Sequence, residues 1–157
     1  MKRQFVVLSV LTLLCIAAHA QSNSKKADYF SAQDIQKQLA DLAPKAQPSG
    51  TSGSTLGDYT SHQLKLSVRT ASGGAESHAH YDDVFVVTQG QATLLTGGVI
   101  DDPKTGDDGE TKGISIRNGN SQTISVGDVV NIPAGTPHQL KIVQGTLFST
   151  IVVKVRE

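Results

Sequence analysis

Two histidines, His78 and His80, lie two residues apart near the middle of the 157-residue chain. If this segment is a strand, both imidazoles point to the same face and can contact one metal ion. Three carboxylates are close in sequence, those of Glu76, Asp82 and Asp83. Imidazole nitrogen and carboxylate oxygen are common ligands of divalent transition metals. The pair alone is weak evidence, because two exposed loop histidines produce the same pattern.

A third histidine, His138, ends a segment rich in turn-forming residues. Gly127 and Asp128 predict a turn into a buried strand, and Pro133 and Gly135 predict a second turn just before His138. This arrangement directs His138 back across a small barrel, toward the other two histidines. The alternative is a β-turn that carries a partly exposed histidine.

Together, the two segments resemble the cupin superfamily over residues 60–155. Cupins are marked by the motifs G-x5-HxH-x3,4-E-x6-G and G-x5-PxG-x2-H-x3-N. The second motif is matched in residue and spacing by Gly127, Pro133, Gly135 and His138. The first motif is matched more loosely, by His78, His80 and Gly90.

The carboxylate of the first motif is the main departure from the cupin pattern. Counted back from Gly90, the position of the motif's Glu is taken by Asp83. Counted forward from His80, the loop before Asp83 is one residue short. We therefore expect Asp83 to be the carboxylate ligand, with Asp82 as the alternative. If either residue only supports the site, three histidines remain as ligands.

The resemblance implies an all-β fold, a cupin-type β-barrel (double-stranded β-helix or jelly roll) with one short N-terminal helix. It implies one divalent metal ion, Fe, Mn, Ni, Cu or Zn, bound by His78, His80, Asp83 and His138. Such a site leaves coordination positions for water or substrate. The implied function is a small-molecule metalloenzyme of the oxygenase, isomerase, lyase or decarboxylase type. The alternatives are a non-catalytic ligand- or metal-binding (sensing) module, and an interaction protein that docks through its helix.

The chain after residue 57 reads as a series of short strands. Leu64, Leu66 and Val68 alternate with polar residues, which predicts a half-buried strand. Residues 84–88 and 92–96 flank a glycine and predict a β-hairpin. The strand at 147–155 is apolar enough either to pair with a second copy in a homodimer or to lie in the centre of a sheet.

Two polar segments complete the organisation of the chain. Residues 101–113 contain no apolar side chain, which predicts an exposed loop with solvated carboxylates; a calcium site there is the alternative. At the other end of the domain, Ser31 and the helical spacing after it predict a helix over 32–43, stopped by Pro44. Residues 44–57 are rich in Pro, Gly, Ser and Thr and predict a linker.

The first twenty residues have the pattern of a signal peptide. Lys2 and Arg3 precede an apolar run, and Ala18 and Ala20 form an A-x-A cleavage site. We expect cleavage after Ala20, an extension over 21–57, a barrel over 58–157, and a periplasmic or secreted protein. The alternative is an uncleaved anchor.

Removal of the leader sharpens the chemistry of the remaining chain. Cys15, the only cysteine, leaves with it, so thiolate metal sites and disulfides are excluded and metal binding must use His and carboxylate. The remaining 137 residues carry 12 basic and 14 acidic side chains, which disfavours nucleic acid as a partner. We therefore expect a small-molecule partner and no stable membrane insertion.

Overall fold

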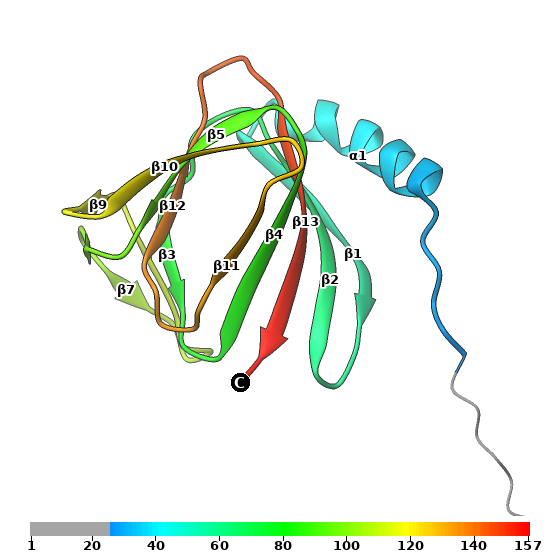
Figure 1. The fold of residues 1–157 in the computed structure, drawn as a ribbon. Helices are drawn as coiled ribbons and strands as arrows, with labels where there is room; N and C mark the ends of the chain where they lie inside the picture. Colours follow the sequence, from blue (N-terminus) through cyan, green and yellow to red (C-terminus); the bar gives the residue numbers. More distant parts are fainter. Residues whose placement is uncertain (1–25) are drawn as a thin grey trace, which may run out of the picture.

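The computed structural model describes residues 26–157, and its strands form two facing sheets that close into a barrel (Figure 1). The predicted signal peptide, residues 1–20, lies outside these described residues. Within residues 26–157, no helix has the length and apolar character that crossing a membrane requires.

Antiparallel pairing connects all the strands of both sheets. The first sheet contains, in spatial order, β1 (Thr51–Asp58), β2 (His62–Arg69), β13 (Phe148–Arg156), β4 (Tyr81–Gln89) and β11 (Val129–Ile132). The second contains, in spatial order, β10 (Asn120–Ser125), β5 (Gln91–Thr96), β12 (His138–Lys141), β3 (Ala75–His78), β8 (Glu110–Gly113) and β7 (Lys104–Thr105). A separate two-stranded ribbon pairs β6 (Val99–Ile100) with β9 (Ile116–Arg117). The all-β prediction is confirmed.

The apolar core of the barrel lies between the two sheets. Phe148 and Ile124 are almost completely buried there, and the cluster contains ten buried side chains in total. Phe85 and Val152 lie directly opposite each other on β4 and β13 and belong to this cluster. Because side chains of one face alternate along a strand, the next inward-facing positions, Asp83 and Lys154, lie just beyond the core.

The helix α1 (Ala32–Ala46) covers the outer face of the first sheet (Figure 1). Its N-cap is Ser31, whose Oγ accepts a hydrogen bond from the Asp34 backbone amide. The predicted stop at Pro44 was wrong, because Pro44 lies within the last turn and the helix runs on to Ala46. A proline in a last turn interrupts little of the hydrogen-bond ladder, so the helix can continue briefly beyond it.

The apolar side of β2 faces this helix and not the barrel interior. Leu66 and Val68 pack with buried helix residues in a second hydrophobic cluster. Alternation then directs Lys65, Ser67 and Arg69 to the interior. The prediction of a half-buried strand is confirmed, with its polar side facing inward.

The linker predicted for residues 44–57 was wrong. Thr51–Asp58 form the edge strand β1, which pairs with β2 from end to end except for a register shift between Thr55 and Gly57. Ser and Thr disfavour helices but fit an edge strand whose outer backbone groups remain in water. The composition of a loop and that of a polar edge strand are therefore hard to distinguish.

The hairpin predicted around Gly90 was also wrong. The strands before and after Gly90, β4 and β5, belong to different sheets. Gly90 has a φ of +75°, and a Cβ there would clash with the carbonyl oxygen of Leu147. The glycine thus allows the chain to cross between sheets where another segment packs closely against it.

The strand at residues 147–155 occupies a central position. As β13 it pairs with β2 on one side and β4 on the other. Its backbone edge is therefore not free to pair with a second copy of the chain.

Candidate metal centre

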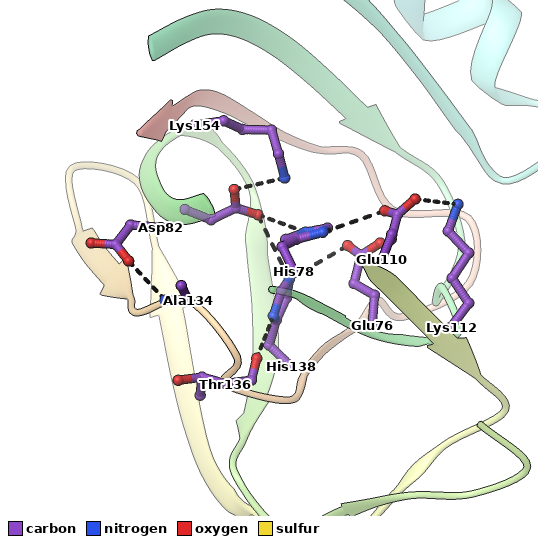
Figure 2. Close-up of polar contacts among 10 residues, drawn as sticks. Glu76, His78, Asp82, Glu110, Lys112, Ala134, Thr136, His138 and Lys154 are labelled. Atoms are coloured by element: carbon purple, nitrogen blue, oxygen red, sulfur yellow. Dashed lines mark hydrogen bonds and ion pairs between the residues drawn. The ribbon is translucent and has the colours of Figure 1, made fainter. Parts of the chain in front are cut away.

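Strand register brings six ionisable side chains together at one end of the barrel. Directly opposite residues in antiparallel strands have Cβ atoms about 5 Å apart, so their side chains interact. Three such pairs meet here: Asp83 with Lys154, Glu76 with His138, and His78 with Glu110. The first pair comes from one sheet and the other two from the facing sheet, so the group spans the barrel interior (Figure 2).

One carboxylate oxygen lies between the two imidazoles. The Oδ2 of Asp83 is 3.2 Å from the Nε2 of His78 and 3.7 Å from the Nε2 of His138. The Oε1 of Glu76 is 3.5 Å from the same Nε2 of His138. Glu76, His78 and His138 each offer a ligand atom within 4.8 Å of the others. This spacing allows the three side chains to hold one metal ion.

Each imidazole presents its Nε2 to this group and has a partner at its Nδ1. The Nδ1 of His138 lies 3.0 Å from the carbonyl oxygen of Thr136. Because a carbonyl oxygen only accepts, Nδ1 carries the proton, and Nε2 of the neutral ring carries a lone pair. The Nδ1 of His78 is similarly close to Glu110, at 3.4 Å from its Oε1 (Figure 2). A ligating histidine is commonly oriented by such a partner on its other nitrogen.

The Nε2 atoms of the two histidines have no partner with hydrogen-bond geometry within residues 26–157. The Nε2 atoms of His78 and His138 are both buried and both lack one. Buried polar atoms are usually hydrogen-bonded, so two unpartnered nitrogens beside two carboxylates need an explanation. A divalent ion among them would satisfy both, and the donor set of imidazole nitrogen and carboxylate oxygen suits a transition metal.

The structure brings together three of the four ligands expected from sequence, His78, Asp83 and His138. His80 is exposed, lies in the turn that follows β3, and is not part of the group. Glu76 takes its place, two residues before His78 on the same face of β3.

With Glu76 in place of His80, the spacing between the last histidine of the first motif and Asp83 also agrees with the motif. Counted from His78, four residues precede Asp83, which the first cupin motif allows, and six more precede Gly90. The first motif thus reads with Glu76 in the position of its first histidine and Asp83 in the position of its glutamate. The mismatch in loop length was the signal in the sequence that could have identified Glu76.

Asp82, the alternative carboxylate, has a different role. Its Oδ1 accepts a hydrogen bond of 2.7 Å from the backbone amide of Ala134 (Figure 2). The next turn residue, Gly135, donates its amide to the carbonyl oxygen of His78 at 2.7 Å. Asp82 therefore stabilises the turn that leads to His138.

The segment 101–113 contributes to the site, contrary to the prediction that its carboxylates are all solvated. Its strand β8 pairs with β3, so Glu110 lies opposite His78. Lys112 holds the other oxygen of Glu110, with Nζ 2.9 Å from Oε2. A local run of polar residues does not reveal this pairing, because the contact depends on a distant strand.

Opposite charges shift the pKa values of the group. Burial acts to raise the pKa of Glu76, but contact with His138 outweighs it and lowers this pKa to about 2. Burial likewise acts to raise the pKa of Asp83, and His78 and Lys154 reverse the effect, so it is lowered. Burial acts to lower the pKa of His138, whereas Glu76 and the Thr136 carbonyl raise it above 6.5 overall. Without metal, the site thus favours ionised carboxylates and a protonated His138.

Metal affinity is expected to fall as the pH is lowered through the raised pKa of His138. Below that pKa, which lies above 6.5, a proton occupies the nitrogen that must bind metal. The apparent affinity should then fall about tenfold per pH unit, because one proton competes with the ion. Glu76 adds nothing until the pH approaches its own pKa of about 2. Competition titration of Zn²⁺ against a chromophoric chelator checks this, and an affinity that stays constant from pH 7.5 down to 5.5 would contradict it.

The group borders two neighbouring hollows. The first is a cavity with a volume of about 170 Å³ and is bordered by Glu76, His78 and Asp83. The second hollow, of about 340 Å³, shares His78 with it and is lined also by His80. His78 thus lies between the two hollows, and His80 lines only the second.

Comparisons with known proteins identify the fold. No family model and no curated protein matches the sequence. A solved structure from Bacillus halodurans matches 82% of this chain and 81% of its own, with 15% identity and a TM-score of 0.58. An uncharacterised conserved protein with a double-stranded β-helix domain, from Klebsiella pneumoniae, matches 83% of this chain and 91% of its own, with 14% identity and a TM-score of 0.57.

An enzyme is among the similar structures. The DMSP lyase of Ruegeria pomeroyi matches 68% of this chain, with 16% identity and a TM-score of 0.50. The present chain spans about half the length of that lyase, 47%. At such identities the likeness concerns the fold alone, and the fold agrees with the two facing sheets described above. Residues 26–157 therefore have a double-stranded β-helix fold.

Proposed function

We propose that this protein is an exported, single-domain metalloenzyme that acts on a small molecule. Glu76, His78, Asp83 and His138 would hold one divalent transition metal. The observation that carries the proposal is the pair of buried, unpartnered Nε2 atoms directed at two carboxylates. When bound, such an ion acts as a Lewis acid and lowers the pKa of a bound water. Export and a periplasmic or secreted location rest on the pattern of residues 1–20.

The charges of the group suit a divalent ion. The carboxylates of Glu76 and Asp83 are ionised, as their lowered pKa values indicate, and two neutral imidazoles add no charge. The two negative charges of the ligands offset the charge of one divalent cation, which would be costly to bury without them. The ligand set itself does not distinguish among Fe, Mn, Ni, Cu and Zn.

Lys154 orients one of these ligands. Its Nζ lies 2.8 Å from the Oδ1 of Asp83 (Figure 2), and Oδ2 then points to the histidines. Its contact with only one oxygen leaves the other available to metal. Lys154 is therefore a positioning residue next to the metal group.

The exchange Asp83→Asn tests the ligand assignment. It should weaken metal binding at least about tenfold, because an amide oxygen carries no charge to balance the ion. Asp82→Asn is the matched control, since its amide oxygen can still accept the Ala134 amide hydrogen. Metal content after purification and a Zn²⁺ titration measure both variants. Negligible effects in both would show that Asp83 is not a ligand.

Two measurements on the unmodified protein test the function itself. Protein purified from its own compartment should retain about one equivalent of a transition metal, and less than about a tenth would contradict a metal function. Oxygen-uptake and small-molecule turnover screens on the metal-loaded protein then test catalysis. A retained metal without turnover of any screened compound would favour the non-catalytic binding module.

A further inference from the structure

We propose that the small molecule bound beside the metal is an organic acid, and that Lys65 and Arg69 bind its carboxylate. The inference rests on the proposed metal function and specifies its substrate class. Both side chains lie on the inner face of β2 and border the same cavity as Glu76, His78 and Asp83.

The inward direction of these cations follows from strand register. On β13, Val152 lies opposite Lys65 and Phe148 lies opposite Arg69, and both of these apolar residues belong to the barrel core. Residues directly opposite each other share a face, so the two cations point into the barrel. Lysine and arginine are rarely directed to an interior without a partner.

Neither cation has a carboxylate within ion-pair distance in residues 26–157, although the charge of Arg69 helps to lower the pKa of Glu76. No ion pair there includes Lys65 or Arg69, whereas Lys154 is paired with Asp83 and Lys112 with Glu110. The Nε of Arg69 is buried and has no hydrogen-bond partner. An unsatisfied guanidinium nitrogen in a cavity wall is a donor for a ligand oxygen, and its planar geometry suits a carboxylate.

The net charge of the cavity favours an anion once metal is present. The lining contains three cations and three carboxylates: Lys65, Arg69, Lys154, Glu76, Asp83 and Glu110. These charges cancel, so a divalent ion among the ligands leaves two excess positive charges. A cavity with excess charge of one sign concentrates ligands of the other sign.

The remaining lining selects an organic acid over an inorganic anion. Phe85, Leu140 and Val152 border the cavity on the side of the barrel core. A ligand with a short carbon chain can contact this apolar floor while its carboxylate meets Lys65 and Arg69. The volume of about 170 Å³ limits the ligand to a small molecule, since a cavity of about 150 Å³ accommodates benzene.

Calorimetric titration of the Zn²⁺-loaded protein with succinate tests this inference. Succinamide is the neutral probe of the same shape, and inorganic phosphate is the anion without a carbon chain. Succinate should bind at least about tenfold more tightly than either, because only it combines a charged contact with an apolar body. Equal binding of succinate and succinamide, or tighter binding of phosphate, would overturn the proposal.

Variants of Lys65 and Arg69 test whether these two residues are responsible for the binding of succinate. Lys65→Gln and Arg69→Gln should each weaken succinate binding about tenfold or more, while Arg69→Lys should retain part of it. Lys104→Gln is the control, because Lys104 is exposed on β7. Circular dichroism checks that each variant is folded. Glutamine variants that are folded and bind succinate like the unmodified protein would exclude this wall as the carboxylate site.

Metal content, measured on the same samples, separates this inference from the proposed function. Protein that holds no Zn²⁺ would contradict the metal function, whatever it does with succinate. In that metal-free protein, a preference for succinate over succinamide that depends on Arg69 would still support the carboxylate site. Metal-loaded protein without that preference would contradict the carboxylate site alone.

Discussion

The substitution His138→Ala is expected to remove almost all metal from the protein, from about one equivalent to less than about a tenth. His138 contributes a buried Nε2 that faces both Glu76 and Asp83. Its ring is held through Nδ1 by the Thr136 carbonyl, which keeps Nε2 directed at the two carboxylates. Loss of the ring also leaves two carboxylates close together without the group that lowers the pKa of Glu76. Metal analysis of purified protein and a Zn²⁺ titration measure the effect.

The matched control for this prediction is His80→Ala. It removes the same kind of ring from an exposed turn near the site, and metal content should stay near that of the unmodified protein. Loss of metal in His80→Ala, together with retention in His138→Ala, would reverse the assignment. In that case His78 and His80 would be the ligands, and Glu76 and His138 would not bind metal.

The substitution Phe148→Ala should lower the free energy of unfolding by about 3–5 kcal/mol. Phe148 is 1% exposed at the start of β13, within the core cluster beneath the metal group. Removing the ring deletes its contacts and leaves a cavity that β-strands in two sheets cannot fill by collapse. Since domains are stable by about 5–15 kcal/mol in total, a large part of the stability would be lost.

Urea denaturation of the metal-free protein, followed by circular dichroism, measures this loss without a contribution from metal binding. Val143→Ala is the control, because Val143 is 73% exposed and should change the free energy of unfolding by less than about 0.5 kcal/mol. A change below about 1 kcal/mol for Phe148→Ala would show that the barrel core does not depend on this ring.

His138 was predictable from sequence because local residues position it. Gly127 and Gly135 both have positive φ values, and the spacing of these turns around Pro133 is contained within one short segment. Glycines in a sequence indicate where such backbone conformations can occur, since glycine adopts positive φ at little cost. The strand that carries His138 follows directly from the turn.

Glu76 could not be chosen over His80 by the same reasoning. Glu76, His78 and His80 have the same parity, so alternation along a strand places all three on one face. The choice depends on where β3 ends, and distant backbone contacts determine that point. The amide of Ala79 donates to the carbonyl of Gly109 at 3.1 Å, and β3 itself ends at His78, so His80 lies in the turn that follows. Sequence periodicity contains no information about such a contact.

The sequence also did not determine which sheet a strand joins or which of its faces lies inside the barrel. Gly90 indicated a turn, and a turn is present, but only long-range pairing decides whether the next strand returns beside the first or crosses to the facing sheet. For β2, the alternation of Leu66 and Val68 with polar residues correctly indicated two unlike faces. Which face lies inside depended on α1, whose apolar stripe packs on the strand from a separate part of the chain.

Because α1 covers the outer face of β2, the two faces of this strand have different roles, stability on the outside and cavity lining on the inside. Leu66 and Val68 contribute to stability from the outside, under the helix, while Lys65, Ser67 and Arg69 face the cavity and contribute little to either hydrophobic cluster. Mutations on the inner face can therefore accumulate without unfolding the sheet. In a barrel of this kind, substitutions on the inner face of β2 can change the charge and size of the ligand that the cavity accepts, while the strand itself keeps its position.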